Sequence, residues 1–329
     1  MKLPKIVFLP TLVTLVLCAS AISYEWNSDR SPAAKADDSV KAFLGRWDLT
    51  LKARDREYPS WLELREEGGK LQAQMVGRWG NARPLPKVSI TDGHLTFVSP
   101  KDEEAAQADM VFEGTLTGNQ LSGTVNGPDG TTWTWTGRRA PSLERTGTPK
   151  WGKPIPLFNG KDLTGWRMRP ADSTKVWKVE NGALITPGNG PELIYDGKKF
   201  EDFKLHVEFN CAENSNSGIY LRGRYEVQME TDSIEEPPSH HMGSVYGFLA
   251  PEPELPRKPG TWQTYDITLI GRRITVVQNG QAIIDNKEIP GITGGALDSH
   301  EELPGPIYLQ GSEKGPVAYR SIVITPAEK

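Results

Sequence analysis

The chain has 329 residues, 24% charged and 37% hydrophobic, which is enough for two ordinary domains or one large all-β domain. A formal net charge of −4 and a pI near 5.9 give no basic surface for phosphates, so composition argues against a nucleic-acid partner. The 33 glycines, 26 prolines and abundant aromatic residues favour many short strands joined by turns.

The first residues have the pattern of a Sec-type signal peptide. Lys2 and Lys5 precede an apolar run over residues 6–17, and Ala19-Ser20-Ala21 offers small side chains at −3 and −1 of a cut after Ala21. The run is shorter than the roughly 20 residues that a membrane-spanning helix needs. We therefore expect residues 1–21 to be removed on export to the periplasm or outside the cell, leaving no transmembrane segment in the mature chain.

The two cysteines add little chemistry. Cys18 suggests lipoprotein anchoring as an alternative, but Leu17 is bulkier than the position before a lipidated cysteine usually allows. Cys211 would then be the single cysteine of the mature chain, so no disulfide within it is expected. Because Cys211 lies in an alternating apolar stretch, we interpret it as a buried structural thiol.

Residues 22–40 are polar and aperiodic, as expected for a linker, and residues 41–140 then alternate in the period of strands. Glycine-rich and Asp-Gly turns separate the apolar segments. The predicted strands begin at or include Gly45-Arg46-Trp47, 61–64, 71–76, 88–90, 95–98, 110–114, 121–125 and 132–136. Sequential short strands of this kind indicate a small antiparallel barrel or meander. The Gly-x-Trp opening resembles that of lipocalin-like barrels, in which the Trp closes one end.

A second domain is predicted over residues 154–329. Residues 141–153 have two prolines and no apolar period, so we interpret them as a linker. The β pattern then resumes, with strands expected at 262–270, 274–278, 281–285, 307–310 and 322–324, and with Asn279-Gly280 as the clearest hairpin turn. No amphipathic run of helical length occurs here, so we expect a two-sheet sandwich. Trp166, Trp177 and Trp262 fit core positions better than a sugar platform.

The segment 214–230 is the most informative for function. Strand side chains alternate between faces, so the apolar members should face the core: Ile219, Leu221, Tyr225, Val227 and Met229. The opposite parity carries Tyr220, Arg222, Arg224, Glu226, Gln228 and Glu230. If Gly223-Arg224 is a turn, two neighbouring strands can still present these groups on one face. An ordinary solvated sheet surface would also carry such residues. Carboxylates, amides, arginines and an aromatic ring together nevertheless suit a sugar.

Four motifs make residues 154–326 resemble the 3-keto-disaccharide hydrolase family. They are Leu157–Trp166, Trp177–Leu184, Asn216–Gln228 and Gly305–Gly311. The resemblance implies a sandwich of the concanavalin A-like lectin/glucanase type, and an enzyme that cleaves 3-keto-glycosides. One departure is that members often carry a histidine soon after the closing Gln-Gly, where this chain has Ser312-Glu313-Lys314.

The chemistry that this resemblance implies follows from the ketone. A carbonyl at C3 acidifies the C2 proton, so a base can remove it and the C1 substituent can leave by elimination, with water added afterwards for net hydrolysis. Such a site needs a base near C2, a cation or donor for the enolate oxygen, and an acid for the departing oxygen. We expect Glu226 as the base and Arg222 as the enolate stabiliser, with Asp232 or Glu230 as alternatives. The substrate-binding candidates are Tyr220, Arg224, Gln228, Tyr246 and Gln310.

A divalent metal is a second possibility at the same site. Glu230, Asp232, His240 and His241 combine carboxylates and imidazoles near one loop, which would suit an ion that polarises the substrate oxygens. Adjacent histidines rarely point at one ion, however, and loop histidines are commonly only solvated.

Two other function classes stay open. The same sandwich hosts lectins, so a non-catalytic carbohydrate-binding module of the cell envelope is the main alternative. The chain could also be an envelope interaction protein whose barrel holds a partner or a small apolar ligand. An enzyme needs carboxylates that converge with a cation, whereas a lectin can manage with an open aromatic shelf.

Overall fold

The computed structural model describes residues 38–78, 80–231 and 235–328. The predicted signal peptide, Cys18 and Asp232 lie outside the described residues. The predicted linker over residues 22–40 ends in a short helix, α1 (Asp38–Lys41), and the only other helical segment described is the 3₁₀ turn η1 (Pro238–His240). No helix in these ranges is long and apolar enough to span a bilayer. The expected all-β class is confirmed, with strands in every sheet antiparallel to their neighbours.

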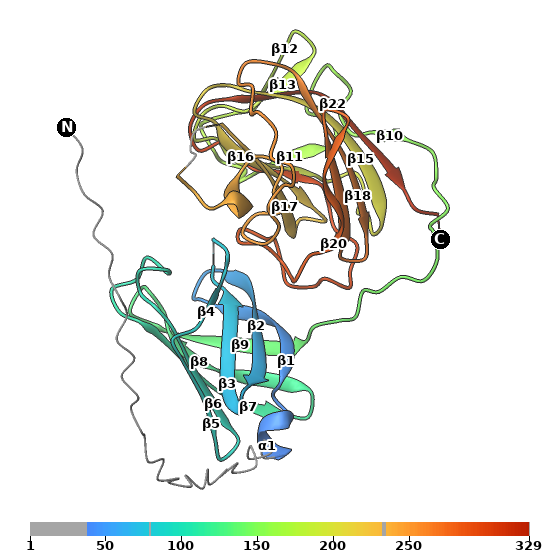
Figure 1. Ribbon diagram of the computed structural model, residues 1–329. Coiled ribbons are helices and arrows are strands. Elements are labelled where there is room, and N and C mark those ends of the chain that lie inside the picture. The colour runs from blue at the N-terminus through green and yellow to red at the C-terminus, as the bar shows by residue number, and fades with distance from the viewer. Residues whose placement is uncertain (1–37, 79, 232–234, 329) are drawn as a thin grey trace, which may run out of the picture. The chain divides into compact units, whose positions relative to one another are not determined.

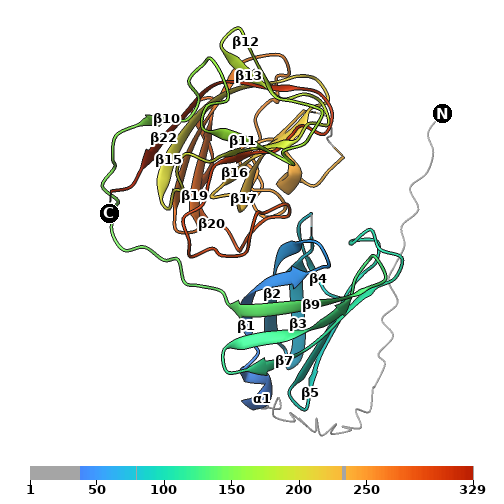
Figure 2. The same ribbon diagram turned by 180° about the vertical axis from the view of Figure 1, so that it is seen from behind.

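The first sheet is a nine-stranded antiparallel barrel (Figures 1 and 2). Its strands are β1 (Gly45–Lys52), β2 (Glu57–Glu67), β3 (Lys70–Val76), β4 (Ala82–Pro84), β5 (Lys87–Thr91), β6 (His94–Ser99), β7 (Met110–Thr117), β8 (Gln120–Asn126) and β9 (Thr132–Arg139). All the predicted strands are present, and β4 is one that periodicity missed because it is short and ends in Pro84. β1 pairs with β9, which rolls the meander up.

Alternation fills the barrel interior with one face of each strand. Trp47 is fully buried there, and its indole N–H donates to the Phe43 carbonyl oxygen at 2.7 Å, while the Arg139 guanidinium lies 3.8 Å from the ring centroid. Phe97 and Phe112 stack at 4.4 Å across β6 and β7. The predicted role of Trp47 as a plug is therefore consistent with its complete burial near α1.

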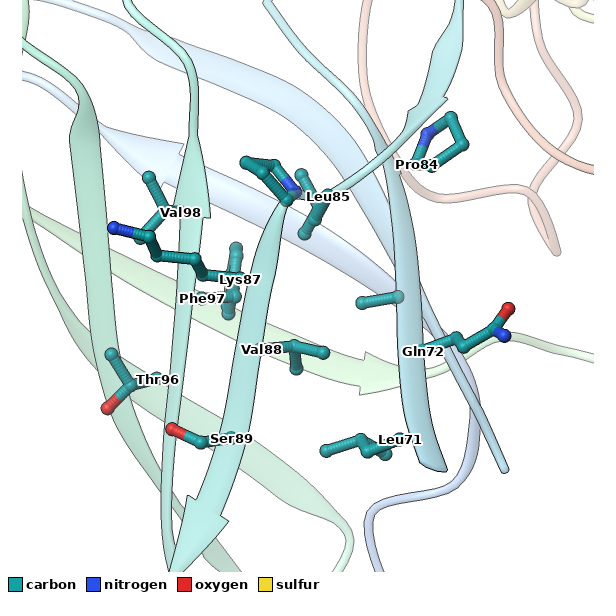
Figure 3. A pocket seen from close by; sticks show the side chains of 12 residues that line it. Leu71, Gln72, Pro84, Leu85, Lys87, Val88, Ser89, Thr96, Phe97 and Val98 are labelled. Atoms are coloured by element: carbon teal, nitrogen blue, oxygen red, sulfur yellow. The ribbon is translucent and has the colours of Figure 1, made fainter. Parts of the chain in front are cut away.

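The pairing path of the barrel begins at β4 and ends at β5, so hydrogen bonds do not join β3 to β5. A hollow of about 530 Å³ opens between these strands (Figure 3). Leu71 and Val88 line it from the two strands, and Phe97 of β6 also lines it. The barrel is thus rolled but incompletely closed.

The second half is the expected sandwich of two sheets (Figures 1 and 2). The larger sheet contains β10 (Ile155–Pro156), β12 (Lys178–Glu180), β13 (Ala183–Ile185), β15 (Phe203–Cys211), β18 (Gln263–Ile270), β19 (Arg273–Gln278), β20 (Gln281–Glu288) and β22 (Val317–Pro326). The smaller sheet runs in the order β11 (Trp166–Arg169), β14 (Glu192–Tyr195), β21 (Tyr308–Leu309), β16 (Asn216–Leu221) and β17 (Tyr225–Glu230).

The apolar faces of these two sheets share one core. Trp166 and Trp177 lie in it as expected, but Trp262 does not: it is 38% exposed and stacks under the Arg320 guanidinium at 4.4 Å. Trp262 lies just before β18, so it does not belong to the strand and its side chain does not follow the strand's alternation. Cys211 is fully buried, and burial raises the pKa of its thiol to about 12, so it is a structural residue.

Candidate active site

The polar groups of segment 214–230 gather on one face of the smaller sheet. β16 and β17 pair so that Tyr220 lies opposite Glu226, Gly218 opposite Gln228, and Asn216 opposite Glu230. The apolar parity faces the sandwich core, as predicted. The two strands are joined by a turn over residues 222–224, which includes the expected Gly223-Arg224, and Arg222 and Gly223 both have positive φ (53° and 68°). The polar face is also buried rather than solvated, which contradicts the simplest surface interpretation.

The Glu226 carboxyl occupies space that a glycine leaves free. Glu226 is 4% exposed, and its side chain lies across β16 over Gly218. A Cβ at position 218 would stand 2.2 Å from Glu226 Oε1 and 2.7 Å from its Cγ, closer than any real contact. Only a glycine at this point of the strand lets the carboxyl rest where it does.

A single hydroxyl proton links Glu226 to its surroundings. The Tyr220 hydroxyl lies 2.8 Å from Glu226 Oε2 and 2.7 Å from the carbonyl oxygen of Gly294, which can only accept. Because a tyrosine has one proton to donate, both contacts are hydrogen bonds together only when the carboxyl itself carries a proton. Burial raises the pKa of Glu226 to about 8, the Tyr220 hydrogen bond works against this rise, and the charge of Glu313 adds to it. The carboxyl can therefore gain or release a proton near neutral pH.

Behind Glu226 the network continues through stacked rings. Tyr220 stacks on Tyr308 at 4.2 Å and 13°. The Tyr308 hydroxyl donates to Glu192 Oε1 at 3.0 Å, and the Arg169 guanidinium donates to the same carboxylate at 3.0 Å. Burial raises the pKa of both tyrosines well above its usual value, so both stay protonated. This arrangement fixes the orientation of the Tyr220 hydroxyl toward Glu226.

Amides flank the carboxyl along the same face. Gln228 is 3% exposed and its Nε2 donates to Asn216 Oδ1 at 3.3 Å, while the backbone N–H of Gln310 donates to the Gly218 carbonyl at 2.9 Å. The Oε1 atoms of Gln228 and Gln310 are buried, and neither has a hydrogen-bond partner among the described residues. Buried acceptors of this kind usually find a donor, and sugar hydroxyls are suitable donors.

Tyr246 lies next to Glu226 on a loop that follows β17. Its backbone N–H donates to the Glu226 carbonyl at 3.0 Å, and its ring stacks on His240 at 4.4 Å. Burial, followed by the charge of Glu226, raises the pKa of the Tyr246 hydroxyl to about 12. Tyr246 therefore keeps a neutral hydroxyl, and its substrate-binding role stays a prediction.

The two predicted arginines lie elsewhere. The Arg222 guanidinium donates to the Tyr225 hydroxyl at 3.0 Å and to the Gly271 carbonyl at 2.8 Å. Because the turn includes Arg222 itself, its side chain leaves the parity of Glu226 and joins the core side, so the expectation that it meets Glu226 is not fulfilled. Arg224 binds Asp298 at 2.7 Å and the Leu303 carbonyl at 2.8 Å. Both guanidiniums thus hold loops rather than the open part of the face.

The members of the expected metal set have other partners. Glu230 lies 3.1 Å from the Arg257 guanidinium, and His240 Nδ1 lies 3.2 Å from Glu236. His241 contacts Glu254 through Nδ1 at 3.0 Å and the Glu236 carbonyl through Nε2 at 2.8 Å. Within the described ranges no three His, Cys, Asp or Glu side chains gather as a metal site would require.

Glu313 belongs to the segment Ser312-Glu313-Lys314 that follows Gln310-Gly311. It is exposed, its backbone N–H donates to the Asn216 carbonyl at 2.9 Å, and its charge acts on Glu226. The position therefore borders the candidate site.

Sequence reasoning missed three contributors, namely Gly218, Thr293 and Gly294. Gly218 interrupts an otherwise bulky strand, which is a readable signal of close approach. Thr293 and Gly294 belong to a loop that is more than sixty residues away in sequence, and no local pattern marks them.

This all-β sandwich thus presents a buried carboxyl flanked by amides and tyrosines, groups that can hydrogen-bond hydroxyls. The family model for a 3-keto-alpha-glucoside-1,2-lyase-like domain matches residues 153–325. The chain belongs to this family.

The chain is similar to one curated protein and to two solved structures over part of its length. A 3-keto-disaccharide hydrolase from Bacteroides thetaiotaomicron is 29% identical over 87 residues, a match that covers 24% of this chain and 30% of that protein. A solved structure described as a glycosyl hydrolase, from Parabacteroides distasonis, is 28% identical with a TM-score of 0.45, covering 55% of this chain and 92% of that one. Another from the same organism is 24% identical with a TM-score of 0.41, covering 53% and 98%.

Proposed function

We propose that this protein is an exported enzyme that cleaves 3-keto-glycosides, with Glu226 as the base that removes the C2 proton. Family membership supports a carbohydrate-active protein. The observation that carries the finer proposal is the buried Glu226 carboxyl over Gly218, whose pKa is raised to about 8. A general base works best when its pKa lies near the operating pH, and an ordinary surface carboxylate would be too weak.

The reaction balances without an oxidant. Glu226 takes the C2 proton, the electrons of the C–H bond form the C2–C3 enolate, and collapse of this enolate expels the C1 oxygen to leave a C1–C2 double bond. The protonated Glu226 can return its proton to the departing oxygen. Addition of water at C1 would convert the resulting enone into the free 3-keto sugar, which is net hydrolysis.

The surrounding groups suit this sequence of steps. The Oε1 atoms of Gln228 and Gln310 can accept from sugar hydroxyls, and the Tyr246 hydroxyl, kept neutral by burial, can donate to an oxygen that becomes negative. Because Arg222 lies on the core side, we assign the enolate to the neutral Tyr246 hydroxyl rather than to a guanidinium.

The test is incubation with a 3-keto-disaccharide in deuterium oxide, followed by mass spectrometry of substrate and products. We expect deuterium at C2 of recovered substrate, together with release of the monosaccharide and of a 3-keto-glycal or 3-keto sugar. Saturable binding with neither exchange nor release would instead favour the carbohydrate-binding module. The matching unoxidised disaccharide is the control, since without the ketone its C2 proton is not acidic and no exchange is expected.

A further inference from the structure

We propose that the N-terminal barrel positions the reacting carboxyl, with Trp61 as the positioning residue. The inference rests on the proposed role of Glu226 and gives the barrel a function in the site of the other half of the chain. The barrel and the sandwich belong to a single compact unit that spans Ala36–Lys329. Barrel residues contact the segment 299–302, where Arg46 pairs with Glu301 and Arg138 with Glu302, and they also contact the two loops that hold Glu226.

The first loop, residues 291–294, holds Glu226 from one side. The Glu226 backbone N–H donates to Thr293 Oγ1 at 3.1 Å, and the Thr293 N–H donates to the Arg224 carbonyl at 2.9 Å. The Gly294 carbonyl oxygen is the acceptor that lies 2.7 Å from the Tyr220 hydroxyl. This loop therefore positions the backbone of Glu226, and it also accepts a hydrogen bond from the hydroxyl of Tyr220, which lies against the Glu226 carboxyl.

The barrel holds this loop by its backbone. The Trp61 indole N–H donates to the Ile292 carbonyl at 3.0 Å in a buried contact, and the Gly294 N–H donates to the Gly80 carbonyl at 3.1 Å. The loop also fits the ring closely, because a Cβ at Gly291 would stand 2.6 Å from Trp61 Nε1. Every residue from 291 to 294 thus has a bond or close contact that leads to the barrel or to Glu226.

The second loop holds Glu226 from the other side. The Tyr246 N–H donates to the Glu226 carbonyl at 3.0 Å. Phe248, two residues on, stacks with Trp61 at 6.0 Å, and Asn81 packs so closely on Gly247 that a Cβ there would meet it at 2.1 Å. The N–H and the carbonyl of Glu226 therefore both end on loops that barrel residues contact.

The barrel makes these contacts with a side chain that its own core does not use. On β2, Leu62 and Leu64 face the barrel interior, and strand alternation points Trp61 outward. Trp61 is nevertheless 1% exposed, because it is buried in the core of the sandwich. An outward tryptophan that a second domain buries, and whose N–H meets a loop carbonyl of the site, fits a positioning role better than a place in the barrel core.

The experiment compares Trp61→Phe and Gly291→Ala with Trp135→Phe in the full chain. Gly291→Ala disturbs the same contact from the sandwich side. Trp135 is the matched control, since it is equally buried and donates at 3.0 Å to Thr124 within the barrel. Amide hydrogen exchange at Glu226 and Thr293 is the first measurement, and turnover of a 3-keto-disaccharide as a function of pH is the second.

We expect both test variants to speed exchange of these two amides about tenfold and to lower kcat by a similar factor with a smaller change in KM. The rise of activity with pH should begin at a lower pH, because a loosened loop admits water to Glu226 and lowers the pKa of its carboxyl. Trp135→Phe should lower only the melting temperature. Unchanged exchange in both test variants, or equal loosening in the control, would overturn the inference. If the wild type does not turn over 3-keto sugars, the proposed function fails, while amide exchange still decides the barrel's role.

Discussion

Replacing Glu226 by glutamine should alter both turnover and the pH dependence of stability. Glutamine keeps the shape over Gly218 and a hydrogen bond to Tyr220, but it cannot accept the C2 proton. We expect turnover and C2 exchange to fall roughly 10²–10⁴-fold, the usual contribution of a positioned acid or base, with little change in substrate affinity. In the wild type, activity should rise with pH toward a plateau above about 8, because the base must be deprotonated.

The stability effect follows from the same burial. The pKa of Glu226 rises from 4.5 to about 8 on folding, so the folded state holds a proton that the unfolded state has lost across this window. The contribution of this proton to the free energy of unfolding is fully present below pH 4.5, falls as pH rises, and is lost above about pH 8. At about 1.4 kcal/mol for each pH unit the whole window corresponds to roughly 5 kcal/mol, and the part above pH 6 to roughly 3 kcal/mol.

Urea unfolding of the wild type and of Glu226→Gln at pH 6 and pH 9 measures this difference. The variant should gain roughly 3 kcal/mol relative to the wild type between the two pH values, since its amide does not titrate. Glu180→Gln, on an exposed position of β12, is the matched control and should show no such gain. If wild type and Glu226→Gln have parallel pH profiles, the carboxyl is not held as a buried acid, and the base assignment loses its physical support.

Three further predictions address neighbouring groups. Gly218→Ala should displace the Glu226 carboxyl and lower turnover at least 10²-fold, as checked by kinetics together with a crystal structure of the variant. Arg222→Lys should lower the free energy of unfolding by about 1–3 kcal/mol while kcat of the folded protein stays the same, because Arg222 contacts Tyr225 and Gly271 rather than the site. A fragment of residues 154–329 should melt cooperatively, since the sandwich has its own core, but at a lower temperature than the full chain because Trp61 no longer fills its place.

Local pattern was enough to predict the architecture. Strand period and turn residues placed the barrel and the sandwich, because each strand buries one parity and the turns need particular residues, such as Asp92-Gly93 with both φ values positive. The pattern failed at β4, where three residues ending in proline carry no period, and at Trp262, which precedes its strand. The independence of the two halves stays a prediction that the fragment experiment tests.

The site was only partly predictable, for a physical reason. Parity placed Glu226 and Gln228 on one face, because both lie within a single strand. It failed for Arg222, since a residue with positive φ at a turn no longer follows the alternation of the strand before it. Neither parity nor spacing could reveal that the Tyr220 hydroxyl contacts the Gly294 carbonyl, because the two residues lie far apart in sequence and meet only in the folded chain.

The same reasoning explains why the protonation of Glu226 depends on the whole molecule. A carboxyl on an open strand would keep its ordinary pKa, so the raised value requires the loops that exclude water from it. One of these loops accepts a hydrogen bond from Trp61 and donates one to the Gly80 carbonyl, and both barrel residues precede Glu226 by more than a hundred residues. Because a pKa near neutrality is what makes a carboxyl a useful base, the barrel contributes to the proposed chemistry without presenting a reacting group of its own.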